Sequence, residues 1–301
     1  MCGIFGAVSS SHVHRDLIEG LSKLEYRGYD SAGLTIISKS NKIKRLRCTG
    51  KVIALKKLLA SNKLVGSCGV AHTRWATHGI PNIKNSHPHN YGGFSIVHNG
   101  IIENFEEIKS FLSKKSHKFS SETDSEVIVH LLEYFSKKHN KLSDILLNTF
   151  KKLSGSFALG IVYEKEPDKI IVASNGSPLL IGIGKNANYI SSDINALVSK
   201  TKKYISLEDN EFGIITKDTI DLFNISGKKI KRLPSVTKQN TNAISKNGYK
   251  HFMQKEIFEQ KDIITRVIKD KLGSSKILPN IFGPKSDSML RSIKHVHFVA
   301  C

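Results

Sequence analysis

Residues 1–10 read MCGIFGAVSS, and they place a cysteine directly behind the first methionine, at the start of an apolar run. The β-branched and aromatic residues between glycines are typical of a strand between tight turns. A free cysteine is usually a small buried hydrophobic residue. If Met1 is removed, however, Cys2 carries a thiol and a free α-amine, and an amine with a pKa of about 8 can take the thiol proton. The position of Cys2 alone leaves both interpretations open.

Further runs in the first two-thirds of the chain show the same strand pattern. They are SAGLTIIS at 31–38, GSCGVAHT at 66–73, FSIVHNGII at 94–102, GSFALGIVY at 155–163, KIIVASN at 169–175 and PLLIGIG at 178–184. Apolar spacing between them predicts helices at 104–115, 123–135 and 142–153. Strands, then helices, then strands again predict an α+β architecture in which helices cover the faces of sheets.

Two of these helices have a defined apolar face. The first places Ile108, Phe111 and Leu112 on one side. In the second, Thr123 and Glu126 fit a capping box. Its buried stripe is expected to consist of Val127, Ile128, Leu131, Leu132 and Phe135.

The composition indicates a folded protein, with 39% hydrophobic and 24% charged residues in a chain of 301. No window approaches the roughly 18 consecutive apolar residues of a membrane span, and the first residues lack a secretory signal pattern. The four cysteines lie far apart, without metal-ligand spacing. Such sparse usage favours a reducing compartment and predicts a cytoplasmic protein with no metal site and no membrane partner.

The charge is strongly basic, with 46 Lys and Arg against 26 Asp and Glu, a formal net charge of +20. A basic surface can bind nucleic acid. Here the lysines stand in short scattered groups without interleaved aromatic residues, so we expect no nucleic-acid partner. The same charge would attract a small phosphorylated substrate.

The sequence changes character near residue 234. Residues 234–250 are polar and predict a linker, and residues 251–272 predict a further helix. Its residues available for burial are Phe252, Ile257, Ile263, Ile264, Val267 and Ile268. The chain ends on the β-like run HVHFVAC at 295–301. We therefore expect a domain at 1–233, a linker at 234–250, and at 251–301 the incomplete start of a second domain that packs poorly without its remainder.

A series of specific segments follows the first strand: EYRGYDSAG, AHTRWATHG, HNGIIENF, SETDSE and FMQKEIFEQ. In this order, together with CGIFG, they closely resemble the N-terminal-nucleophile (class II) glutamine amidotransferases, and most closely the glutamine–fructose-6-phosphate aminotransferase family. The resemblance covers essentially the whole chain. It implies a four-layer αββα sandwich, followed by a linker and the truncated start of an α/β sugar-isomerase domain. Lys261 departs from the family, which commonly has proline there.

The resemblance assigns the catalytic centre. Cys2 is the expected nucleophile, with its freed α-amine as base. Asn99 and Gly100 are expected to supply a side-chain and a backbone N–H to the oxyanion of the tetrahedral intermediate. The alternative for Asn99-Gly100 is a type I′ hairpin turn.

Two charged residues suit the two ends of glutamine. The Arg74 guanidinium matches the α-carboxylate, although it could instead form a surface ion pair. Asp124 matches the α-ammonium, although an acid is also favoured in the first turn of a helix.

Four further residues match family positions. Thr77 and His78 correspond to residues that contact glutamine, and Trp75 to a loop tryptophan that gates the path of ammonia. The alternative for Trp75 is core packing. Arg27 matches a position beside the terminal cysteine, where it orders the site; its alternative is an ion pair with Asp30.

The resemblance implies an enzyme that hydrolyses L-glutamine through a Cys2 thioester, without a cofactor, and releases ammonia for the conversion of fructose 6-phosphate to glucosamine 6-phosphate. Fructose 6-phosphate and the homodimer belong to an isomerase half that this chain lacks, so only glutamine hydrolysis is expected. A glutaminase subunit that serves another synthase is an alternative, as is another amidotransferase of the same class. A chain that keeps Met1 would be a non-catalytic or regulatory remnant.

Overall fold

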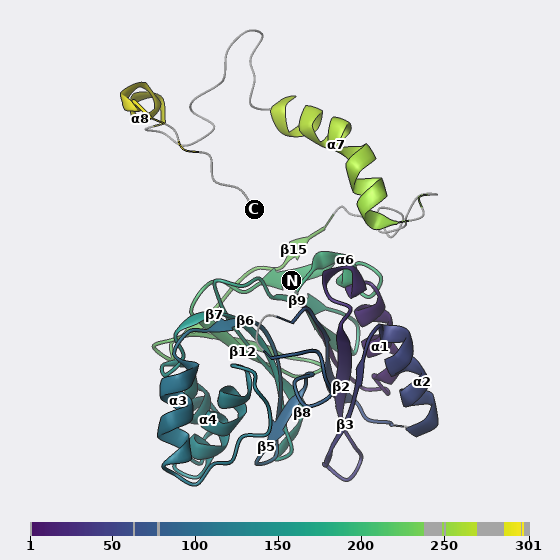
Figure 1. Ribbon diagram of the computed structural model, residues 1–301, viewed down its shortest axis with the longest axis vertical. Coiled ribbons are helices and arrows are strands. Elements are labelled where there is room, and N and C mark those ends of the chain that lie inside the picture. Colours follow the sequence, from purple (N-terminus) through teal and green to yellow (C-terminus); the bar gives the residue numbers. More distant parts are fainter. Residues whose placement is uncertain are drawn as a thin grey trace. The chain divides into compact units, whose positions relative to one another are not determined.

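Two antiparallel β-sheets lie face to face, and helices cover the outer face of each (Figure 1). The computed structural model describes residues 2–62, 64–76, 79–237, 249, 251–269, 286–295 and 297. The chain divides into two units, Met1–Ile244 and Ser245–Cys301. Both sheets belong to the first unit.

The first sheet has the strand order β15-β11-β9-β10-β1-β4-β2-β3. Its strands are β1 (Gly3–Ser9), β2 (Ser31–Ile37), β3 (Ile43–Thr49), β4 (Cys68–Arg74), β9 (Leu180–Ile183), β10 (Ala187–Ser191), β11 (Lys203–Ser206) and β15 (Ser235–Val236). The second sheet has the order β14-β13-β12-β8-β7-β6-β5. Its strands are β5 (His89–Tyr91), β6 (Phe94–Ile102), β7 (Gly155–Tyr163), β8 (Glu166–Asn175), β12 (Glu211–Ile215), β13 (Ile220–Asn224) and β14 (Lys229–Ile230).

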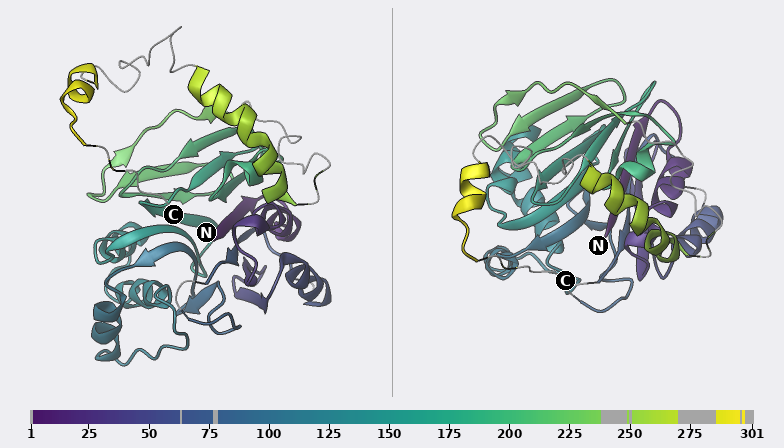
Figure 2. Two further views of the ribbon diagram at one scale, coloured as in Figure 1. Left: turned by 45° about the horizontal axis from the view of Figure 1, so that its top comes forward. Right: turned by 90° about the horizontal axis from the view of Figure 1, so that it is seen from above.

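Three hydrophobic clusters separate four layers. One packs α1 (His14–Ser22), α2 (Val52–Asn62) and α6 (Ile194–Leu197) on the first sheet. Another packs α3 (Phe105–Ser113), α4 (Glu126–Ser136) and α5 (Leu142–Phe150) on the second sheet. The third lies between the sheets, and Figure 2 shows the two helical layers on opposite sides of the strands.

Strand alternation decides which side chains enter the space between the sheets. In β4, Val70 belongs to the cluster between the sheets and Ala71 to the cluster under α1 and α2. By the same period His72 and Arg74 point between the sheets. In β1, Ile4 faces inward and Phe5 faces the helices.

The architecture confirms the predicted α+β fold with two helix-covered sheets. Each of the predicted strands in the first two-thirds of the chain is present, with its ends within three residues of the prediction, and the predicted helices correspond to α3, α4 and α5. The sequence interpretation missed α1 and α2. The 3-10 helix Glu25–Arg27 was also not predicted.

One local prediction is wrong, one residue of a predicted apolar face is partly exposed, and one alternative is excluded. Thr123 does not cap a helix: α4 begins at Glu126 without a side-chain cap, and the Glu126 carboxylate accepts the backbone N–H groups of Ser120 and Ser121. Phe111 is 40% exposed, because it lies at the edge of the apolar face, where it meets the Tyr134 ring. Asn99-Gly100 is not a hairpin turn, since β6 continues through it.

The described part of the region after residue 233 contains a further strand and two helices. Val236 in β15 pairs with Lys203 in β11, so regular pairing extends past the expected start of the linker. Residues 238–248 lie outside the described residues.

The second unit has α7 (Phe252–Lys269) and α8 (Ser286–Ser292). Ile257, Ile263 and Ile264 of α7 are exposed, whereas the side chains of the other residues expected for burial, Phe252, Val267 and Ile268, and the run at 298–301 lie outside the described part. A sugar-isomerase identity for this unit stays a prediction. Among the helices described, none is long and apolar enough to cross a membrane.

Candidate functional site

Cys2 lies immediately before β1, where the start of this strand meets the end of β4. The Trp75 N–H donates a hydrogen bond to Cys2 Sγ at 3.2 Å, and the thiol can donate to the Trp75 carbonyl oxygen at 3.5 Å. Burial raises the pKa of the Cys2 thiol above its ordinary value, and this outweighs the lowering by the Trp75 peptide. At neutral pH the side chain is therefore a thiol that needs a base before it can act as a nucleophile.

Asn99 reaches Cys2 from the opposite sheet. Asn99 Nδ2 donates to the Cys2 carbonyl oxygen at 3.1 Å, and Asn99 Oδ1 lies 3.1 Å from His72 Nε2. Asn99 belongs to β6, and its side chain points between the sheets like that of Val97 two residues earlier. The contact joins β6 of the second sheet to the residue that precedes β1 in the first sheet.

Gly100 follows Asn99 with a φ of 124°, a backbone conformation that glycine adopts without a steric penalty. A Cβ atom there would lie 2.0 Å from the Ser156 carbonyl oxygen in the neighbouring strand β7. Only glycine fits this conformation and this close approach. The residue predicted to present a backbone donor is thus fixed in a special geometry beside Asn99.

Arg74 ends β4 and is buried, with 4% of its surface exposed, so it is not part of a surface ion pair. Its Nη2 donates to the Gly79 carbonyl oxygen at 3.1 Å, across the segment that follows Trp75. Asp30, which the sequence interpretation had named only as an ion-pair partner, accepts the Ala76 N–H. Arg74 and Asp30 thus hold the two ends of this segment.

Trp75 is 46% exposed, so the alternative of core packing is wrong. Its ring lies edge-on against Tyr29, with the ring centroids 5.4 Å apart. Thr77 and His78 lie outside the described residues.

Asp124 lies two residues before α4 rather than in the first turn of that helix. Its Oδ2 accepts the Ile102 N–H at 2.8 Å, which ties the carboxylate to β6, the strand of Asn99. Next to it, Ser125 Oγ lies 2.8 Å from His98 Nδ1. The buried Asp124 carboxylate is therefore held by the same strand that carries the two expected oxyanion donors.

Arg27 forms an ion pair with Asp193, with Nη1 2.9 Å from Oδ2. The neighbouring Ser192 contacts Ile4 twice: its Oγ accepts the Ile4 N–H at 3.0 Å, and its N–H donates to the Ile4 carbonyl oxygen at 3.1 Å. Tyr26 also donates to Asp193. Arg27 thereby secures the loop that holds β1 two residues beyond Cys2.

Cys2, Asn99 and the Trp75 peptide are therefore in direct contact, and Arg74 adjoins that peptide. The sequence interpretation missed His72 and Asp193, both of which touch predicted site residues. His72 lies in the motif AHTRWATHG, two residues before Arg74, and this position could have indicated that it belongs to the site. Asp193 gave none, because it lies in a separate loop before α6.

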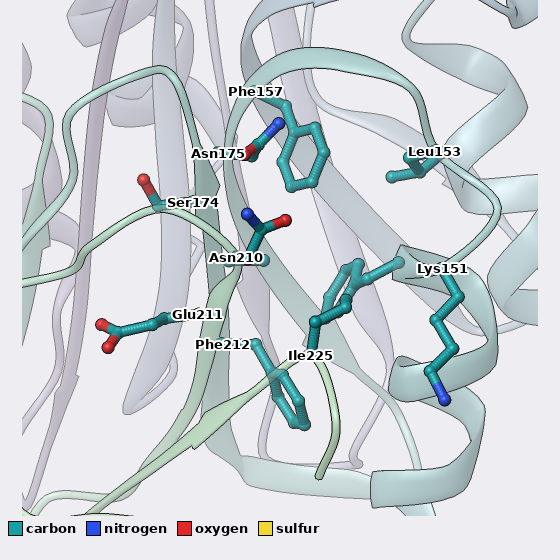
Figure 3. A pocket seen from close by; sticks show the side chains of 11 residues that line it. Lys151, Leu153, Phe157, Ser174, Asn175, Asn210, Glu211, Phe212 and Ile225 are labelled. Atoms are coloured by element: carbon teal, nitrogen blue, oxygen red, sulfur yellow. The ribbon is translucent and has the colours of Figure 1, made fainter. Parts of the chain in front are cut away.

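A separate cavity of about 220 Å³ opens between α5 and the strands β7, β8 and β12 (Figure 3). The rings of Phe157 and Phe212 and the amides of Asn175 and Asn210 line it. Figure 3 shows the Glu211 carboxylate on the other side of the strand from the Phe212 ring, and Glu211 is already paired with Arg232. None of the predicted site residues that the structure describes lines this cavity.

Known proteins are similar to this chain in sequence. A family model described as a glutamine amidotransferase domain matches residues 72–199. Glutamine–fructose-6-phosphate aminotransferase (isomerizing) of Haemophilus influenzae is 40% identical over 301 residues, and that of Clostridium tetani is 43% identical over 305 residues. Both matches cover 100% of this chain and 49% of the relative. The chain thus spans about half the length of these relatives.

Solved structures share the fold. Glutamine phosphoribosylpyrophosphate amidotransferase from B. subtilis superposes with a TM-score of 0.66 at 26% identity, covering 76% of this chain and 50% of that one. A glutamine aminotransferase class-II domain protein from Silicibacter pomeroyi superposes with a TM-score of 0.53 over 74% of this chain and 99% of that one. At 12% identity, the second match supports the fold alone.

Proposed function

Because this chain is a homologue of the amino-terminal, glutaminase half of the glutamine–fructose-6-phosphate aminotransferases and carries a class II glutamine amidotransferase domain, we propose that it hydrolyses the side-chain amide of L-glutamine and releases ammonia. The observation that carries this proposal is the contact of Asn99 Nδ2 with the Cys2 carbonyl oxygen, 3.1 Å away. It brings a fixed hydrogen-bond donor to the residue whose thiol would attack.

Removal of Met1 would give Cys2 a free α-amine, which takes the thiol proton. Sγ then attacks the amide carbon of glutamine, and the carbonyl electrons move onto oxygen. Collapse of this intermediate expels the amide nitrogen as ammonia, with the proton returned by the amine, and leaves a thioester. Water hydrolyses the thioester to glutamate and restores the thiol. The raised pKa of the buried thiol makes a nearby base necessary.

The oxyanion would be stabilised by Asn99 and Gly100. An amide nitrogen carries two hydrogens, so Asn99 Nδ2 can bind the Cys2 carbonyl with one and the oxyanion with the other. The special backbone of Gly100 supports its role as a fixed N–H donor. A preorganised donor of this kind contributes about 3 kcal/mol to transition-state stabilisation.

Glutamine would be held by its charged ends. Arg74 would bind the α-carboxylate and Asp124 the α-ammonium. Both side chains are buried, and each is fixed by a backbone group, Arg74 by the Gly79 carbonyl and Asp124 by the Ile102 N–H. Trp75, with Thr77 and His78, would cover the bound substrate, and Arg27 would steady the start of β1.

The test combines intact mass with turnover. A purified chain should lack Met1, should gain one adduct at Cys2 from an electrophilic glutamine analogue, and should release glutamate and ammonia from glutamine. The Cys2→Ala variant should keep its circular dichroism spectrum and lose both the adduct and the turnover. A chain that keeps Met1 and gains no adduct would contradict the proposal and would favour a non-catalytic role.

The use of the ammonia is a further part of the proposal. The relatives are named for transfer to fructose 6-phosphate, and we propose that residues 251–301, which lie in the second unit, begin the corresponding isomerase region. The chain alone should hydrolyse glutamine without forming glucosamine 6-phosphate. Formation of that product by the purified chain would refute this expectation.

A further inference from the structure

The orientation of the Asn99 amide decides whether the candidate site offers a donor or an acceptor. The two ends of an amide have nearly the same shape, but nitrogen donates two hydrogen bonds and oxygen only accepts them. A rotation of 180° would therefore present oxygen to the Cys2 side, where it would repel an oxyanion. Some neighbouring group must distinguish the two orientations.

His72 is in contact with the far end of this amide. His72 Nε2 lies 3.1 Å from Asn99 Oδ1 and 2.9 Å from the His98 carbonyl oxygen. The backbone carbonyl can only accept, so Nε2 must carry the hydrogen. The same N–H then favours oxygen, and not nitrogen, at the facing end of Asn99.

The rotated amide would be penalised at both ends. Its nitrogen would face the His72 N–H, which places two donors together, and its oxygen would face the Cys2 carbonyl, which places two acceptors together. His72 and Asn99 are both buried, with 1% and 9% of their surfaces exposed. In a buried site an unmet polar group is costly because water cannot replace the lost partner.

The His72 ring is itself held in place. It projects from β4 into the space between the sheets, and the His87 ring packs on it with the centroids 4.2 Å apart. Burial lowers the pKa of His72 to about 3, so the ring is neutral near pH 7 and carries one hydrogen. His72 Nδ1 has no hydrogen-bond partner among the described residues, which fits a tautomer with the hydrogen on Nε2.

We propose that His72 is a positioning residue that fixes the Asn99 amide with its nitrogen toward Cys2. It does so as the neutral tautomer protonated at Nε2, across the contact between the two sheets. The orientation follows from the contacts of His72, whereas its consequence for the reaction rests on the proposed hydrolysis of glutamine.

A double-mutant cycle tests the proposal on the full chain. The variants are His72→Phe, Asn99→Ala and the two combined, with His117→Phe as a control that removes another buried histidine, one that packs against Tyr91 of β5 and His130 of α4. His72→Phe should lower kcat by about tenfold to a hundredfold, with KM within about twofold, because the lost stabilisation belongs to the transition state. His117→Phe should leave kcat within about twofold.

The combined variant distinguishes positioning from an independent effect. If His72 acts through Asn99, the double variant should have the kcat of Asn99→Ala alone. Alkylation of Cys2 by iodoacetamide, which forms no oxyanion, should proceed at the wild-type rate in His72→Phe. The proposal would be overturned if the kcat of the double variant fell by the product of the two single-variant losses, or if Cys2 in His72→Phe were no longer alkylated.

A second measurement needs no turnover. Nitrogen NMR of the chain should show a neutral His72 with hydrogen on Nε2. The side-chain amide hydrogens of Asn99 should exchange with solvent at least about tenfold more slowly in the wild-type chain than in His72→Phe. The opposite tautomer, or equal exchange, would overturn the inference. A wild-type chain that produces no glutamate would refute the proposed function, while these NMR results would still decide the role of His72.

Discussion

Replacement of Gly100 by alanine should test how tightly β6 and β7 are matched at the candidate site. The added Cβ would lie 2.0 Å from the Ser156 carbonyl oxygen, 2.7 Å from its carbonyl carbon and 3.0 Å from Phe157 Cα. These atoms are backbone, so no side-chain rotation can relieve the contact. Either β6 must move away from β7, or the backbone of residue 100 must leave its φ of 124°.

Gly100→Ala should lower the free energy of unfolding by about 4 kcal/mol. Holding a non-glycine residue in such a conformation costs about 1–3 kcal/mol. Moving the strands apart weakens the hydrogen bonds around the Gly100–Phe157 pair, at about 1 kcal/mol each. Gly50→Ala is the matched control, because Gly50 has a φ of 81° but no atom within 4 Å of the added Cβ. It should cost only about 1–2 kcal/mol.

Urea denaturation followed by circular dichroism measures both variants. Gly100→Ala should unfold at a markedly lower urea concentration than Gly50→Ala, and it should also lose glutamine hydrolysis because the Gly100 N–H is displaced. Equal denaturation midpoints for the two variants would refute the reasoning, since they would show that the close approach to Ser156 carries no cost.

Three further predictions concern protons and charge. Burial holds the pKa of His72 and of His89 at about 3, so the folded chain binds fewer protons than the unfolded chain, and stability should fall as pH drops below about 6.5. At pH 5 each of these two histidines should lower the free energy of unfolding by about 2 kcal/mol. The urea midpoint of His89→Phe should therefore depend less steeply on pH than that of the wild-type chain, and an equal pH dependence would contradict this. Glutamine hydrolysis should rise with pH through about 8 as the α-amine loses its proton, and a pH-independent rate would count against the amine as base. Arg27→Gln should lower the free energy of unfolding by about 2 kcal/mol, because the largely buried Asp193 loses its positive partner and keeps only the neutral donors Tyr26 and the Asn195 N–H. Lys42→Gln, which removes a lysine from an exposed ion pair, should change stability by less than about 1 kcal/mol, and equal losses would contradict the importance of burial.

The strands that could be predicted from the sequence are those with strong apolar character. β1, β4, β6 and β7 are buried in long runs, so their residues show the signal of a central strand. β3 reads IKRLRCT and lies at the edge of the first sheet, where its polar residues meet solvent. Such edge strands carry little pattern of their own, because pairing with a neighbour determines them.

The missed helix α2 had a usable signal. Val52, Leu55 and Leu59 are buried at helical spacing, although lysines interrupt the apolar run.

The direct contacts of Cys2 could not be derived from spacing at all. Asn99 lies 97 residues away in the sequence and reaches Cys2 from the opposite sheet. From the sequence alone, only the resemblance of the motifs to a known family predicted that Cys2 and Asn99 belong to one site.

Trp75 gives the chain an intrinsic optical reporter at the candidate nucleophile. It is the one tryptophan in the sequence. Its ring is half exposed against Tyr29, while its own peptide N–H is bonded to Cys2 Sγ. Emission excited selectively in tryptophan therefore comes from this segment and from no other part of the protein. Quenching and wavelength shifts would follow events at Cys2 in real time, without a label.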